Sequence, residues 1–143
     1  MRISEVIRRK GAAVVTVPPQ ATVADLLAVL DDRNIGAVVV SEDEGASVAG
    51  IVTERDVVRH LHARGAGVLE AAVAEVMTVH VHTCVPEDEL EVLARTMTEH
   101  RIRHLPVVVD GKLEAIVSIG DIVKHRLDEL QSERDSLVDY VSH

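Results

Sequence analysis

Aromatic side chains are almost missing from this chain of 143 residues, which has one Tyr and neither Trp nor Phe. The core must therefore be aliphatic, and a hydrophobic content of 47% supplies enough Val, Leu, Ile and Ala to build one. The chain also lacks the positive charge that general nucleic-acid binders need, because its formal net charge is −9 at pH 7. We therefore expect no nucleic-acid partner.

Cysteine and long hydrophobic runs are scarce as well. The single cysteine, Cys84, excludes an internal disulfide framework and is typical of a reducing compartment. No apolar run approaches the ~20 residues that a membrane-spanning helix needs. Residues 1–10 are amphipathic, but they lack the apolar centre of a signal peptide. These absences predict a cytoplasmic protein without a membrane partner.

The most informative stretch of the sequence occurs twice. Residues 50–58 read GIVTERDVV, and residues 115–123 read AIVSIGDIV. Each copy is a β-branched run followed by hydroxyl-x-x-Asp and a new apolar run, which predicts a strand that ends where a helix begins. A helix N-terminus favours phosphate, and an Asp beside it can accept hydrogen bonds from a ribose diol. The alternative is a capping box, in which the two side chains only satisfy backbone donors.

The rest of the chain repeats as well, with offsets of 65 to 70 residues. Thr22 and a following apolar stripe predict a capped amphipathic helix, and this stripe recurs 67 residues later. The leader at residues 3–7 also recurs, at 73–77. A shorter turn at residues 110–112 reduces the offset to 65 in the last part of each copy. The stripe residues are Val23, Leu26, Leu27 and Leu30 in the first copy and Leu90, Leu93, Ala94 and Met97 in the second.

Each copy therefore reads as strand, helix, strand, strand, helix. In the first copy we expect strands at 14–17, 37–40 and 48–52, with a helix from Thr53 through about Ala63. A unit of about 60 residues buries too little surface to be comfortably stable alone, so the two copies should share a core with pseudo-twofold symmetry. The expected boundaries are 1–68 for repeat 1, 69–128 for repeat 2 and 129–143 for a C-terminal helical tail.

These motifs resemble those of the cystathionine-β-synthase (CBS) domain pair, or Bateman module. The motifs are GIVTERD at 50–56, IRHLPV at 102–107 and IVSIGDIV at 116–123, and the resemblance covers roughly residues 1–128. It implies an α/β (α+β) fold of tandem β-α-β-β-α repeats and a regulatory module that is not an enzyme. It also implies that an adenosine-containing nucleotide of the AMP, ADP, ATP or NAD type binds in the cleft between the repeats. No obligatory cofactor is implied, but a homodimer and an unidentified effector protein are.

The resemblance further implies which residues contact the nucleotide. The ribose contacts fall on Asp56 and Asp121, with Thr53 and Ser118 as their hydroxyl partners. The remaining contacts are to adenine, through backbone groups of the first and second strands, and to phosphate, through basic side chains. The adenine residues are Thr16, Ala37, Val38, Thr83, His104, Leu105 and Pro106, and the phosphate residues are Arg55, Arg103 and His104.

The two copies differ at the expected phosphate contacts. Residues 103–104 of repeat 2 are Arg-His, whereas the matching residues 36–37 of repeat 1 are Gly-Ala. Conversely, Arg55 of repeat 1 is replaced by Gly120 in repeat 2. The resemblance implies that each cleft takes phosphate donors from both repeats. The cleft built on Asp121 would then have Arg103 and His104 from its own repeat and Arg55 from the other, so we expect a phosphate-bearing ligand to prefer it.

Two further patterns leave alternatives open. His80, His82 and Cys84 alternate along a predicted strand, so they would share one face and suit zinc. However, residues 83–86 align with 16–19, where no ligand is possible, and no fourth ligand is fixed. We therefore expect no metal site. The alternatives to a nucleotide sensor are a metal- or redox-responsive module and a dimeric scaffold that no longer binds nucleotide.

An apolar stripe also runs along the tail, which is expected to continue the last helix. The stripe is interrupted at residues 132–134. It should pack either on its own domain or on a partner protomer. Its members are Leu127, Leu130, Leu137 and Val141.

Overall fold

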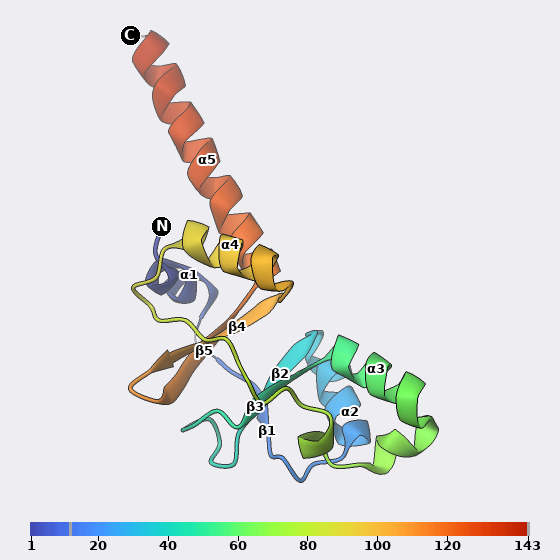
Figure 1. The fold of residues 1–143 in the computed structure, drawn as a ribbon. Coiled ribbons are helices and arrows are strands. Elements are labelled where there is room, and N and C mark those ends of the chain that lie inside the picture. Colours follow the sequence, from blue (N-terminus) through green and yellow to red (C-terminus); the bar gives the residue numbers. More distant parts are fainter. Residues whose placement is uncertain (12, 143) are drawn as a thin grey trace. The chain divides into compact units, whose positions relative to one another are not determined.

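The structure, a computed structural model, describes residues 1–11 and 13–142 and contains helices and two small sheets (Figure 1). The helices are α1 (Ile3–Lys10), α2 (Val23–Arg33), α3 (Glu54–Arg64), α4 (Leu90–His100) and α5 (Ile119–Ser142), with 3-10 helices η1 (Ala66–Glu70) and η2 (Val73–Glu75). The strands are β1 (Thr16–Val17), β2 (Ala37–Val40), β3 (Gly50–Thr53), β4 (His104–Val109) and β5 (Lys112–Ser118).

The chain divides into two compact units. Unit 1 holds the described residues of 1–12, 83–107 and 115–143, and unit 2 holds residues 13–82 and 108–114. These units do not coincide with the two sequence repeats, because each unit includes the leader of the other repeat. The repeat boundaries expected from the sequence stay a prediction.

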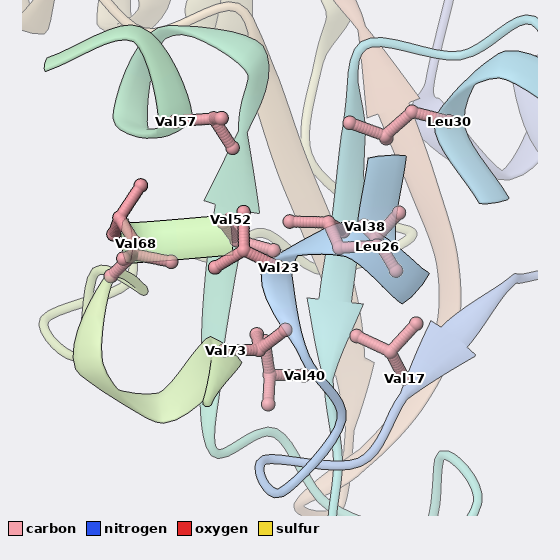
Figure 2. Packing of buried hydrophobic residues seen from close by; sticks show 11 residues of the cluster. Val17, Val23, Leu26, Leu30, Val38, Val40, Val52, Val57, Val68 and Val73 are labelled. Atoms are coloured by element: carbon pink, nitrogen blue, oxygen red, sulfur yellow. The ribbon is translucent and has the colours of Figure 1, made fainter. Parts of the chain in front are cut away.

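Unit 2 is built on a sheet with the strand order β1-β2-β3. β1 pairs with β2 in parallel, and β2 pairs with β3 in antiparallel orientation. All four residues of β2 are buried, as expected for a continuous apolar run in the middle of a sheet. Figure 2 shows valines from β2 and β3 packed with Leu26 and Leu30 of α2, Val57 of α3 and Val68 of η1. The core is aliphatic, as the composition predicts.

The helices of unit 2 begin and end where the sequence predicts. Thr22 caps α2, its side chain accepting from the backbone N–H of Asp25, while Asp25 accepts from the backbone N–H of Thr22. Asn34 ends the same helix in the left-handed conformation, with φ 53° and ψ 49°. The predictions for α2, β2 and α3 are confirmed within one or two residues.

The leader segments dock in the same way in both units. In unit 1 the backbone N–H groups of Ile3 and Ser4 donate to the carbonyls of Asp88 and Pro86. In unit 2 the equivalent groups of residues 73–74 donate to the carbonyls of residues 21 and 19. The leader of each repeat thus completes the unit that carries the other repeat's first helix.

Unit 1 contains α1, α4 and α5 together with most of the β4–β5 sheet. The turn between these two strands has positive φ values at Asp110 (52°) and Gly111 (78°), as an Asp-Gly hairpin turn requires. The first strand of repeat 2 is reduced to one bridge, between Cys84 and Val107. Its two residues lie 67 positions after the β1–β2 pair Val17 and Val40, so the pairing register of the repeat is kept.

Three sequence predictions need correction. The strand predicted at 14–17 contains only Thr16 and Val17, and the strand predicted at 48–52 begins at Gly50. Residues 80–83 are not in a strand, so the argument that placed His80, His82 and Cys84 on one strand face is wrong. The ends of such short strands depend on where hydrogen bonding to the neighbouring strand stops, and the hydrophobic pattern gives no information on that.

The C-terminal tail forms one continuous helix with the end of repeat 2. α5 runs for 24 residues and includes positions 132–134, where the apolar stripe is interrupted. All residues from 131 to 142 are exposed, and the last turns extend beyond α1 and α4 (Figure 1).

Within the described residues no helix combines the length and apolar character needed to cross a bilayer. Position 143 of the expected tail lies outside those residues.

Gly50, the first residue of β3, has no room for a side chain. A Cβ there would lie 2.7 Å from the Thr78 carbonyl oxygen and 2.8 Å from the Met77 sulfur. Gly50→Ala should therefore destabilise the protein by about 2 kcal/mol, since backbone must move to admit the methyl group. Gly67→Ala is the control, because nothing lies within 4 Å of its Cβ position and it should change stability by less than ~1 kcal/mol. Urea unfolding of both variants measures the difference, and equal midpoints would contradict this packing.

Cys84 is buried, with 5% of its surface exposed. Burial, together with the negative charge of Asp88, raises the pKa of the thiol to about 12. At pH 8 the thiolate fraction is then on the order of 10⁻⁴, so the native protein should react with a disulfide reagent roughly a thousandfold more slowly than the urea-unfolded chain. A fast stoichiometric reaction of the native protein would show that this thiol is accessible and activated.

Candidate functional site

The two hydroxyl-x-x-Asp motifs lie where β3 joins α3 and where β5 joins α5. In unit 2 the Asp56 carboxylate accepts from the Thr53 backbone N–H (2.9 Å) and hydroxyl (3.1 Å). In unit 1 the Asp121 carboxylate accepts from the same groups of Ser118, at 2.9 and 3.0 Å. The hydroxyl oxygens in turn accept the backbone N–H of Asp56 and Asp121. The two junctions therefore have nearly identical internal geometry.

Both motifs are capping boxes, which was the alternative to a ligand-binding motif. The two functions are compatible, because the capping bonds of each Asp end on one oxygen, Oδ2. Among the described residues, no hydrogen bond ends on Oδ1 of Asp56 or Asp121. A carboxylate held in place by its own helix cap therefore keeps an oxygen that can accept a sugar hydroxyl.

The expected phosphate residues of repeat 2 lie beside the start of α5. The backbone N–H of Ile119, the first residue of that helix, donates to the Arg103 carbonyl at 2.8 Å. His104, the next residue, begins β4 and is half-buried, while Arg103 is exposed. The structure thus brings Arg103, His104, Ser118 and Asp121 together at one junction.

At the equivalent junction of unit 2 the positions that match Arg103 and His104 are Gly36 and Ala37, which carry no charge. The Glu54 backbone N–H donates to the Gly36 carbonyl at 3.0 Å, and Ala37 pairs with Thr53. Arg55 is exposed in the first turn of α3, and its assignment to a phosphate stays a prediction.

The expected adenine residues are arranged along the strands next to each junction. In unit 2, Thr16 pairs with Val39, next to Val38. In unit 1 the Cys84 backbone N–H, directly after Thr83, donates to the Pro106 carbonyl at 3.0 Å. The side chains of Val38, Leu105 and Pro106 are buried, so these residues can offer a ligand only backbone groups.

Sequence reasoning missed one residue at the Asp121 junction. The Lys10 ammonium lies 2.5 Å from Asp121 Oδ2 and 2.8 Å from the Ile116 carbonyl oxygen. Lys10 ends the amphipathic stretch of residues 1–10, and 111 residues separate it from Asp121. The only local signal is the basic run at residues 8–10. Such a run is also what a helix C-terminus favours, so it does not by itself indicate a contact with a distant carboxylate.

Lys10 changes the ionisation of Asp121. Partial burial alone would raise the pKa of this carboxyl group, but hydrogen bonds from Lys10 and Ser118, with the positive charge of Lys10, outweigh burial and lower it. Asp121 is therefore an anion at neutral pH.

The sequence also gave no reason to consider Glu54. This residue is exposed at the first position of α3, where repeat 2 has Ile119. It lines a cavity of about 360 Å³ together with Asp31 and five uncharged residues. Two acidic side chains beside the α3 N-terminus disfavour a phosphate there.

The metal hypothesis gains no support from side-chain positions. Over residues 1–11 and 13–142, no three His, Cys, Asp or Glu side chains are grouped so that they could hold a metal ion.

Comparison with known proteins places the chain in a family. The family model of the CBS domain matches residues 3–63 and 73–128. The mitochondrial CBS domain-containing protein CBSX3 of Arabidopsis thaliana is 34% identical over 97% of this chain and 71% of its own length. The crystal structure of the CBS-domain containing protein ATU1752 from Agrobacterium tumefaciens is 40% identical, with a TM-score of 0.85 over 88% of this chain and 99% of that one.

A more distant structure shares the fold alone. The CBS domain pair of protein MJ0100 is 20% identical, with a TM-score of 0.79 over 90% of this chain and 98% of that chain. It was solved in complex with 5′-methylthioadenosine and S-adenosyl-L-methionine. With the family model matched twice along the sequence, the chain belongs to the CBS domain family and carries two CBS domains in tandem.

Proposed function

We propose that this CBS domain pair is a regulatory module that binds an adenosine-containing nucleotide of the AMP, ADP, ATP or NAD type, and that it is not an enzyme. The observation that carries the proposal is the Asp121 carboxylate, which Ser118 holds at the N-terminus of α5 beside the Lys10 ammonium, with the backbone of Arg103 bonded to the first residue of that helix. A carboxylate for a diol and cations for a phosphate are the two chemistries that a nucleotide presents. The adenosine ligands of the MJ0100 pair support this choice of ligand class.

The proposal assigns the phosphate-bearing ligand to Asp121 rather than Asp56. Lys10 and Arg103 belong to the Asp121 junction, whereas the Asp56 junction has Gly36 in place of Arg103 and carries the acidic Glu54 beside Arg55. A charge-assisted hydrogen bond contributes ~1.5–3 kcal/mol, so the loss of one contact weakens binding by about ten- to a hundredfold. An uncharged ligand should discriminate less between the two junctions.

Asp121→Asn and Asp56→Asn form a matched pair of variants, because the two carboxylates make the same capping bonds. We expect Asp121→Asn to weaken AMP binding by at least tenfold in calorimetry, and Asp56→Asn to leave it within about threefold. At 100 times the dissociation constant, AMP should also stabilise the wild-type protein by ~2.7 kcal/mol in a thermal-shift assay.

Asp25→Asn is the control for capping alone, since Asp25 caps α2 in the same manner. It should cost stability without changing the affinity for AMP. If Asp56→Asn abolishes binding and Asp121→Asn does not, the assignment is reversed. If neither variant changes it, the nucleotide interpretation of both motifs fails and the motifs are helix caps only. Stabilisation by zinc in the same assay would favour the metal-responsive module instead.

The proposal includes a homodimer joined through α5, and a separate effector protein that reads the ligand state. Val123, Leu130 and Leu137 recur every seventh residue, and Leu127 and Val141 each follow four residues after one of them. This is the spacing of the seam of a two-stranded coiled coil, and all five side chains are exposed. A second copy of the chain presents the same apolar seam, so two copies can bury their seams against each other. The cytoplasmic location also stays a prediction.

Leu137→Glu should convert the dimer to monomer, since it places a charge in the apolar seam. Ser136→Glu makes the same change of charge one residue away, outside the seam, and should leave the dimer intact. Light scattering at micromolar concentration measures both masses. A wild-type protein of monomer mass, or equal effects of the two variants, would contradict a dimer formed through α5.

A further inference from the structure

Lys10 is the last residue of α1, and its ammonium group bridges two acceptors of the Asp121 junction. One is Asp121 Oδ2 and the other is the backbone carbonyl of Ile116, two residues before Ser118. One third of the Lys10 side chain and one fifth of the Asp121 side chain remain exposed, so a ligand can reach the pair from solvent. A lysine ammonium has three N–H donors, and these two bonds use two of them.

In unit 2 the carbonyl group that matches the one of Ile116 accepts a backbone hydrogen bond instead of a bond from a cation. Ile51, the counterpart of Ile116, exchanges two backbone hydrogen bonds with Thr78, at 2.8 and 3.0 Å. The residue before Thr78 is Met77, which packs against Gly50. Among the described residues, no cation is paired with Asp56. The lysine is therefore a feature of one junction and is not required to build the strand-to-helix connection.

The position of Lys10 affects how a nucleoside can bind. Asp121 Oδ2 already accepts from the Ser118 N–H, the Ser118 hydroxyl and Lys10. A ribose diol that takes both carboxylate oxygens must compete with the ammonium group for Oδ2. An uncharged nucleoside gives the displaced ammonium no anionic partner, whereas a nucleotide brings its own phosphate. The four-carbon stem of lysine lets the charge move between carboxylate and phosphate while α1 stays in place.

We propose that Lys10 makes the Asp121 site selective for phosphate-bearing adenosine ligands over uncharged ones, a step that rests on the proposed function. In the ligand-free protein Lys10 occupies the ribose acceptor and opposes adenosine. In the bound protein it donates to the ligand's phosphate. One side chain thus weakens binding of the wrong ligand and strengthens binding of the right one.

Lys10→Met tests the proposal, since methionine keeps much of the apolar stem and removes the charge. We expect the variant to bind AMP about tenfold more weakly and adenosine about two- to fivefold more tightly, measured by calorimetry on the full chain. These opposite signs separate selectivity from a structural role, because damage to the site would weaken both ligands. Lys124→Met is the control for net charge, as Lys124 is an exposed lysine on α5 of the same unit. It should leave both affinities unchanged.

Lys10→Arg should restore most of the preference for AMP, because it keeps a cation of similar reach. A second measurement needs no ligand: NMR titration of the Asp121 carboxyl group should give a higher pKa in Lys10→Met than in the wild type. Wild-type protein that binds AMP through Asp121, with an unchanged AMP-to-adenosine ratio in Lys10→Met, would overturn this inference and leave the proposed function standing. Wild-type protein that binds neither ligand would overturn both.

Discussion

The bond between a carboxylate and the backbone at the end of a strand is the constraint on which each half of this protein depends. Asp56 and Asp121 fix the residue at which a buried strand ends and a helix begins. The same bond places a negative charge at a helix N-terminus and holds its oxygen in one orientation. The proposed ligand site would therefore use a contact that the fold already needs. Presence of the motif alone cannot distinguish a binding site from a cap, and the surrounding charges must decide.

The exchange of leaders explains why the two junctions can differ while their caps do not. Each leader docks through the same backbone hydrogen bonds, because those bonds depend on register and not on side chains. The side chains that follow are then free to diverge. In unit 2 the position next to the last strand of the repeat, β3, is filled by Met77 and Thr78, which requires Gly50. In unit 1 it is filled by Lys10, and the residue matching Gly50 is the buried Ala115.

Local features of the fold could be predicted from the sequence, and long-range ones could not. The caps and apolar stripes locate α2, α3 and β2 because their signals lie within a few residues of one another. The two Asp side chains and their hydroxyl partners are located in the same way, and their contact with a ribose stays a prediction. The length of β1 depends on a partner strand distant in sequence, and the Lys10–Asp121 pair joins positions 111 residues apart. Neither the strand length nor this ion pair leaves a periodic pattern, so a single sequence gives no signal for them.

The overall charge of the chain makes these few cations more important than their number indicates. A net charge of −9 repels an anionic ligand, but salt screens the repulsion between charges that are more than about 10 Å apart. Binding of a phosphate then depends on the charges within that distance. At the α5 junction these include Lys10 and Arg103, whereas the first turn of α3 carries the opposite charges of Glu54 and Arg55. Because the two caps are equal in geometry, the difference between the two junctions lies in the charges around them, and the proposed preference for one junction should be smaller for a ligand that carries no charge.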